Sequence, residues 1–130
     1  MPRIYTYRGR NAEELRNLTK EQYMSMVTSR QRRAMKRMGL AYRDLIAKVE
    51  KSKKQGSDKP IKTKTREAVI LPGWLGIRFS VHSGKEYKDI LITEEMLGHR
   101  LGEYAFTTKR VQHSAPGIRA TRGSKFLAVK

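Results

Sequence analysis

His99 and Glu103 form a pair whose residue types and spacing suggest acid–base chemistry, because residues four positions apart share one side of a helical turn. The sequence places no serine-nucleophile motif, phosphate-cradling glycine loop or second carboxylate beside them. Glu94 and Glu95 are adjacent, and adjacent helical residues do not face each other, so anions in the first turn of a short helix explain them better. A local structural role is the favoured interpretation of both pairs, and a hydrolase is the less favoured alternative.

Metal, thiol and nucleotide chemistry lack their usual residues. The chain has no Cys, and its three His residues are too scattered for a zinc site. The G-x-G-x-x-G and G-x-x-x-x-G-K-[ST] fingerprints are absent from the sequence. No apolar run approaches the ~18 residues of a membrane helix, and the first ten residues lack a signal-peptide core. We therefore predict a soluble intracellular protein that is not an enzyme, with no cofactor, no metal and no membrane partner.

Positive charge is the dominant property of the chain. Its 130 residues include 29 Lys and Arg against 12 Asp and Glu, a formal net charge of +17. Residues 30–66 hold 14 of the basic residues against 3 acids, and residues 104–130 hold 6 against none, whereas residues 67–103 are nearly neutral. A polyanion neutralises such charge well, and counterion release from nucleic acid favours that partner. This distribution predicts a folded centre between two cationic arms.

The segment SRQRRAMKRM, residues 29–38, concentrates five cations in eight positions. In a helix, Arg30, Arg33 and Arg37 share one face, while Arg32 and Lys36 form an i, i+4 pair of like charge. No acidic residue at i±4 offsets these charges. Repulsion between the like charges therefore destabilises the helix in isolation, and nearby phosphates would stabilise it. An RNA-facing helix is the preferred interpretation, and a solvated charged face is the alternative.

Apolar periodicity predicts an α+β core. Helices are expected from residue 12, over 20–27 with a Thr19–Gln22 capping box, over 29–38 and over 41–54. Alternation predicts a strand over 77–82, a hairpin turn at Ser83-Gly84 and a returning strand through 87–92, with a third strand at 69–71. After a helical turn capped by Thr93, we expect Leu101, Tyr104 and Phe106 to pack on the sheet.

The expected architecture is a small three-stranded, mainly antiparallel sheet with short helices. We divide the chain into a helical basic N-terminal extension (1–50), a basic linker (51–66), the α+β core (67–108) and an extended C-terminal tail (109–130). The linker has seven cations and a single large apolar residue, so it cannot bury itself and is expected to order only on a polyanion. The tail is expected to be disordered in the free protein.

A specific family resemblance covers about residues 65–110. From residue 70 the chain reads ILPGWLGIRFSVHSGKEYKDILITEEMLGHRLGEYAFT, which closely resembles the universal S-nineteen family of small-subunit ribosomal proteins. The family motif M-x-G-H-K-L-G-E-F-A-x-T is matched from Met96 to Thr107, with Arg100 and Tyr104 in place of Lys and Phe. The segment RQRRAMKR and the tail from His113 to Thr121 are similar to the archaeal and eukaryotic branch.

This resemblance implies an α+β protein in the head of the small ribosomal subunit, bound to small-subunit rRNA in the cytoplasm. It also implies a neighbour from the thirteenth small-subunit family and a position near the aminoacyl-tRNA site and the inter-subunit bridge, which makes tRNA and the large subunit candidate partners. A free basic RNA-binding regulator or assembly factor is the alternative. The predicted rRNA-binding residues are Arg30, Arg32, Arg33, Lys36, Arg37, Lys64, Arg66, Lys85, His99, Arg100, Lys109, Arg110, His113, Arg119, Arg122 and Lys125.

Overall fold

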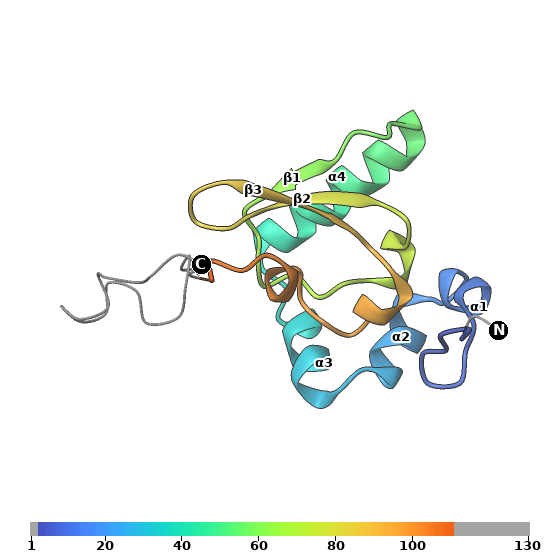
Figure 1. Ribbon diagram of the computed structural model, residues 1–130. Coiled ribbons are helices and arrows are strands. Elements are labelled where there is room, and N and C mark those ends of the chain that lie inside the picture. The colour runs from blue at the N-terminus through green and yellow to red at the C-terminus, as the bar shows by residue number, and fades with distance from the viewer. Residues whose placement is uncertain (1–2, 111–130) are drawn as a thin grey trace, which may run out of the picture.

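The computed structural model describes residues 3–110, which form helices packed against a small sheet (Figure 1). Four α-helices come first in the chain: α1 (Ala12–Arg16), α2 (Lys20–Met26), α3 (Ser29–Lys36) and α4 (Leu40–Gln55). Three strands and three short 3-10 helices follow: β1 (Ile61–Thr63), η1 (Pro72–Trp74), β2 (Arg78–His82), β3 (Tyr87–Leu91), η2 (Glu94–Met96) and η3 (Leu101–Tyr104). The predicted α+β class is confirmed.

The sheet has the order β1-β2-β3 and is mixed. β2 and β3 form the expected antiparallel hairpin, in which Ser80 lies opposite Asp89 and donates a hydrogen bond to its carboxylate. β1 runs parallel to β2, with Ile61 opposite Phe79. The third strand is therefore a parallel edge strand that comes from a part of the chain where no strand was predicted.

Two sequence-based assignments are wrong at this point. The apolar run at residues 69–71 is not a strand of the sheet, because Val69 makes only an isolated bridge to Arg100. The segment 51–66 is not a linker throughout, because α4 continues to Gln55 and residues 61–63 form β1. Of the three β1 residues only Thr63 is buried, so a strand this short and polar leaves little hydrophobic pattern to detect.

The helices begin close to where capping residues place them. The capping box predicted for α2 is present, since the Thr19 hydroxyl accepts from the Gln22 backbone and the Gln22 side chain accepts from the Thr19 backbone. The N-cap position of α3 is Thr28, whose side chain makes no capping hydrogen bond, and the helix ends at Lys36, two residues before the predicted end at residue 38. α4 ends at Gln55 and is followed by Gly56, whose φ of 59° is the left-handed conformation that glycine adopts most easily.

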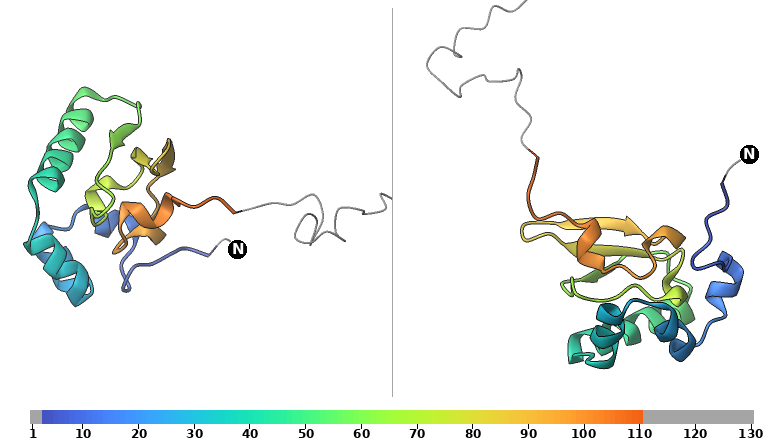
Figure 2. Two further views of the ribbon diagram at one scale, coloured as in Figure 1. Left: turned by 90° about the vertical axis from the view of Figure 1, so that its left-hand side faces the viewer. Right: turned by 90° about the horizontal axis from the view of Figure 1, so that it is seen from below.

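The helices cover one face of the sheet, and the N-terminal segments share its core (Figure 2). Leu15 of α1 and Leu45 of α4 belong to the same buried cluster as Phe79 of β2 and Leu101 of η3. Trp74 is 2% exposed and lies edge-on to the Tyr42 ring. The helical segment before residue 50 is therefore integral to the packing of the fold.

The expectation for Phe106 is wrong: it does not pack on the sheet, and 70% of it is exposed. Leu101 and Tyr104 pack as expected, Leu101 fully buried and Tyr104 against the core. The tail predicted from residue 109 lies outside the described residues beyond Arg110. Within the described residues, no helix is long and apolar enough to cross a membrane.

Candidate nucleic-acid interface

Helix α3 presents most of its cations to solvent. Gln31 and Met35 face the protein and are buried, Arg32 and Ala34 are half-buried, and the remaining side chains of the helix are exposed. The exposed cations of this segment are Arg30, Arg33, Lys36 and Arg37. The structure thus brings four of the five predicted phosphate ligands of this segment to the surface together, without an acidic residue in the helix.

Arg32, the fifth cation, is half-buried and held by hydrogen bonds to backbone carbonyls. Its Nε atom donates to the Met24 carbonyl at 2.8 Å, and its Nη2 atom donates to the carbonyls of Ser25 and Val27 at 3.3 and 3.2 Å. These carbonyls end α2, where backbone acceptors lack helical partners and the helix dipole favours a cation. Arg32 therefore caps α2 and fixes the angle at which α3 follows it.

Arg66 joins three segments through a similar fork. Its guanidinium donates to the carbonyls of His82 at 2.6 Å, Gly102 at 2.9 Å and Ala105 at 2.5 Å. The Gly102 N–H in turn donates to the Arg66 carbonyl at 2.9 Å. Five donors in a rigid plane suit this task, which a lysine would not perform equally well. Arg66 ties the end of β2 to the η3 turn and is half-buried.

Arg100 is also half-buried and partnered. Its Nε atom donates to the Oε1 atom of Gln31 at 3.1 Å, which links the loop before η3 to the buried side of α3. Its backbone forms the bridge with Val69. Three of the predicted rRNA-binding residues, Arg32, Arg66 and Arg100, thus make specific contacts inside the protein.

The His99–Glu103 pair lies on the surface as the i, i+4 spacing predicts. The His99 Nδ1 atom lies 2.7 Å from the Glu103 carboxylate, and the two side chains are 52% and 46% exposed. The His99 ring also packs edge-on against Tyr104, 6.2 Å between centroids. These contacts hold the turn between η2 and η3, in agreement with the structural interpretation of the pair.

A second group of cations lies where the β2–β3 hairpin meets the end of the described chain. Here Lys85 of the hairpin turn and Lys109 and Arg110 line a hollow of about 790 Å³. Lys88 of β3 lines it too, with its ammonium 5.2 Å from the centroid of the Phe106 ring. Figure 1 shows the hairpin turn and the orange segment on the same side of the molecule.

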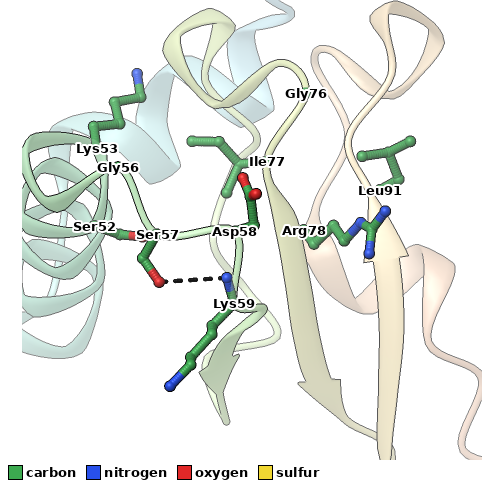
Figure 3. A pocket seen from close by; sticks show the side chains of 10 residues that line it. All are labelled: Ser52, Lys53, Gly56, Ser57, Asp58, Lys59, Gly76, Ile77, Arg78 and Leu91. Atoms are coloured by element: carbon green, nitrogen blue, oxygen red, sulfur yellow. Dashed lines mark hydrogen bonds between the residues drawn. The ribbon is translucent and has the colours of Figure 1, made fainter.

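Another hollow, of about 540 Å³, lies between the end of α4 and the sheet (Figure 3). It is less suited to phosphate, because the Asp58 carboxylate stands in it and Lys53 donates to the Gly73 carbonyl. In Figure 3 the Lys59 side chain extends away from the other lining residues.

Sequence reasoning missed two cations that lie against aromatic rings, Lys88 over Phe106 and Lys62 over Tyr87 at 5.5 Å from the ring centroid. Lys62 belongs to the strand that was not predicted, so only cross-strand pairing could have revealed its contact. Lys64, which follows that strand, is exposed. The predicted residues His113, Arg119, Arg122 and Lys125 lie outside the described residues.

Two tyrosines anchor the helices to the segment that was expected to be a strand. The Tyr23 hydroxyl donates to the Ile70 carbonyl at 2.7 Å and accepts from the Gly98 N–H at 2.8 Å. The Tyr42 hydroxyl donates to the Val69 carbonyl at 2.8 Å. Burial raises the pKa of both phenols well above the ordinary value, because the charged form would lose its hydration.

The fold and its charges define a class before any comparison: a small α+β protein with surface clusters of Arg and Lys suited to a nucleic-acid backbone. Residues 32–113 match the family described as Ribosomal protein S19. The chain is 45% identical over 128 residues to the small ribosomal subunit protein uS19 of Saccharolobus solfataricus, covering 97% of this chain and 91% of that protein. It is 39% identical, with the same coverage, to the protein of that name from Metallosphaera sedula.

The chain therefore belongs to the ribosomal protein S19 family, as the residues from 70 to 107 indicated. Both relatives are archaeal and match over nearly the whole chain, which confirms the assignment to the archaeal-type branch.

Proposed function

We propose that this chain is a structural component of the small ribosomal subunit that binds small-subunit rRNA through two groups of exposed cations and through the exposed Lys64 after β1. One group lies on and just after α3, and the other lies at the hairpin turn and the end of the described chain. The proposal rests most directly on one observation, the separation of the basic side chains into partnered and exposed ones. It extends to a place in the cytoplasmic ribosome, within the head of the subunit.

The partnered arginines support this assignment by exclusion. Arg32, Arg66 and Arg100 each donate to protein acceptors, so their charge serves the fold. Among the predicted residues that the structure describes, eight cations are exposed: Arg30, Arg33, Lys36, Arg37, Lys64, Lys85, Lys109 and Arg110. These are the residues that we propose contact phosphates, because exposed cations on a rigid fold fix the register of a protein on a nucleic-acid backbone without reading its bases.

The salt dependence of binding tests this proposal. If all eight cations meet phosphates, the logarithm of the affinity for a transcript of the rRNA head region falls with the logarithm of salt concentration at a slope of about −6 to −7. The double variant Arg33→Ala/Lys36→Ala reduces that slope by about 1.5, whereas Lys20→Ala, an exposed cation outside both groups, leaves it unchanged. A nearly flat salt dependence of the unaltered protein would contradict the proposal.

The finer placement is also part of the proposal. We place the chain beside a head protein of the thirteenth small-subunit family, near the aminoacyl-tRNA site and the inter-subunit bridge, with tRNA and the large subunit as further partners. The alternative, a free RNA-binding regulator or assembly factor, shares the charge but not the stable partner. Sedimentation with purified small subunits separates the two, because the ribosomal proposal requires co-migration at moderate salt.

A further inference from the structure

Phe106 is an exposed aromatic ring in a cationic setting. It follows the buried Ala105, which packs in the core, so the backbone that carries the ring is anchored by the fold. The ring itself is 70% exposed. Large apolar side chains at the surface are common singly and need no explanation alone, so the surroundings of the ring decide whether it has a function.

Those surroundings favour an anionic, planar partner. The hollow of about 790 Å³ beside the ring is lined by four cations, Lys85, Lys88, Lys109 and Arg110, and by two carboxylates, those of Glu86 and Asp89. The Asp89 carboxylate already accepts the Ser80 hydroxyl. The Lys88 ammonium lies over the ring, 5.2 Å from its centroid. This cation–π contact places a positive charge directly beside the exposed aromatic surface.

We infer that Phe106 is a stacking platform for an unpaired base of the rRNA, with the surrounding cations holding the flanking phosphates. An aromatic surface beside Lys and Arg is the arrangement by which proteins bind single-stranded nucleic acid, because every base has a π-face and every linkage carries a charge. A purely apolar protein contact would cover the ring but would leave the net positive charge of the hollow unmatched. This inference rests on the proposed rRNA binding and names a contact within it.

Substitution at position 106 tests the inference with the full chain and a transcript of the rRNA head region. Phe106→Ala is expected to weaken binding about 5- to 150-fold, the range for loss of one aromatic–base stack, while leaving the salt slope unchanged. Phe106→Tyr is expected to retain affinity, and Phe106→Leu to lose it as Phe106→Ala does. Ile4→Ala is the matched control, because Ile4 is 82% exposed and lies outside both groups of cations.

A direct signal comes from Phe106→Trp. The native Trp74 is 2% exposed, so its emission is expected to change little on binding, whereas a tryptophan at position 106 is expected to be quenched by a stacked base. Quenching that follows the binding curve supports the inference.

Three results would overturn it: full affinity in Phe106→Ala, retained affinity in Phe106→Leu, or no quenching in a Phe106→Trp protein that binds. Retained affinity in Phe106→Leu indicates a purely apolar contact, of the kind that a protein partner makes. In each case the unaltered protein still binds, so the proposed function stands while the inference falls. Failure of the unaltered protein to bind the transcript refutes both.

Discussion

Arg32 and Arg33 are adjacent cations of α3 that the structure assigns to opposite tasks, and replacing each with alanine separates folding from binding. Arg32 donates three hydrogen bonds to the carbonyls that end α2, whereas Arg33 is exposed. Sequence reasoning placed both residues on the rRNA side. The structure instead predicts that Arg32→Ala destabilises the fold and that Arg33→Ala weakens binding.

The contacts of Arg32 determine how much stability Arg32→Ala is expected to lose. A hydrogen bond from a charged donor contributes about 1.5–3 kcal/mol. Because Arg32 is only half-buried, water can replace part of the guanidinium, so we expect a loss of about 1.5–3 kcal/mol for the whole fork rather than for each bond. At about 4–8 °C per kcal/mol for a domain near this size, the melting temperature falls by about 6 °C or more.

Thermal denaturation followed by circular dichroism at fixed ionic strength measures this difference. Arg33→Ala serves as the matched control, because exposed surface substitutions change stability by about 0.5 kcal/mol or less. In the rRNA titration, Arg33→Ala is expected to reduce the salt slope by about 0.7–0.9, one phosphate contact. Equal melting temperatures for the two variants would refute the capping role of Arg32. If Arg32→Ala reduced the salt slope of rRNA binding without loss of stability, Arg32 would be a phosphate contact instead.

Two further predictions concern stability. Burial raises the folded-state pKa of Tyr23 and Tyr42 above the unfolded value near 10, so their contribution to the free energy of unfolding is fully present below about pH 10 and is lost as the pH rises further, at about 1.4 kcal/mol per pH unit for each phenol. Urea unfolding between pH 9 and 11 should show that Tyr23→Phe loses stability less steeply with pH than the unaltered protein. The same dependence of stability on pH in both proteins contradicts the assignment. Gly102→Ala is expected to lower the free energy of unfolding by about 1–3 kcal/mol, because its Cβ would lie 3.0 Å from both the carbonyl oxygen and the Cβ of Arg66. Gly73→Ala is the control, because its Cβ would meet one Lys side-chain atom at 3.5 Å. Equal melting temperatures for the two variants contradict the steric argument.

Local signals were enough to predict the helices and the hairpin. The capping box from Thr19 to Gln22 and the apolar stripe from Tyr42 to Val49 depend on neighbours within one or two helical turns, and both elements form as predicted. The parallel strand β1 was missed because its partner Phe79 lies well along the chain from Ile61, and its own three residues bury only Thr63. Parallel pairing leaves no turn signal between the strands.

Which arginines are partnered inside the protein and which are exposed could not be predicted from the sequence, for a similar reason. The acceptors of Arg66 are carbonyls of residue 82 at the end of β2 and of residues 102 and 105 in the η3 turn, two segments that only the fold brings together. Nothing in the sequence next to Arg66 or Arg33 shows that the first is partnered inside the protein and the second is exposed. The charge predicts a polyanionic partner for the chain as a whole, but only the packing shows which residues remain exposed to meet it.

The shared core has a consequence for the order in which this chain can fold as it is made. Leu15 near the beginning packs in one buried cluster with Leu101 and Ala105, and the Tyr23 hydroxyl bonds to the backbone of Gly98. The helices leave the ribosome first, yet their apolar sides have no permanent cover until the last quarter of the chain has emerged. From the synthesis of α3 until about residue 105 has been added, the growing polypeptide therefore carries an incompletely buried hydrophobic surface together with a cationic helix.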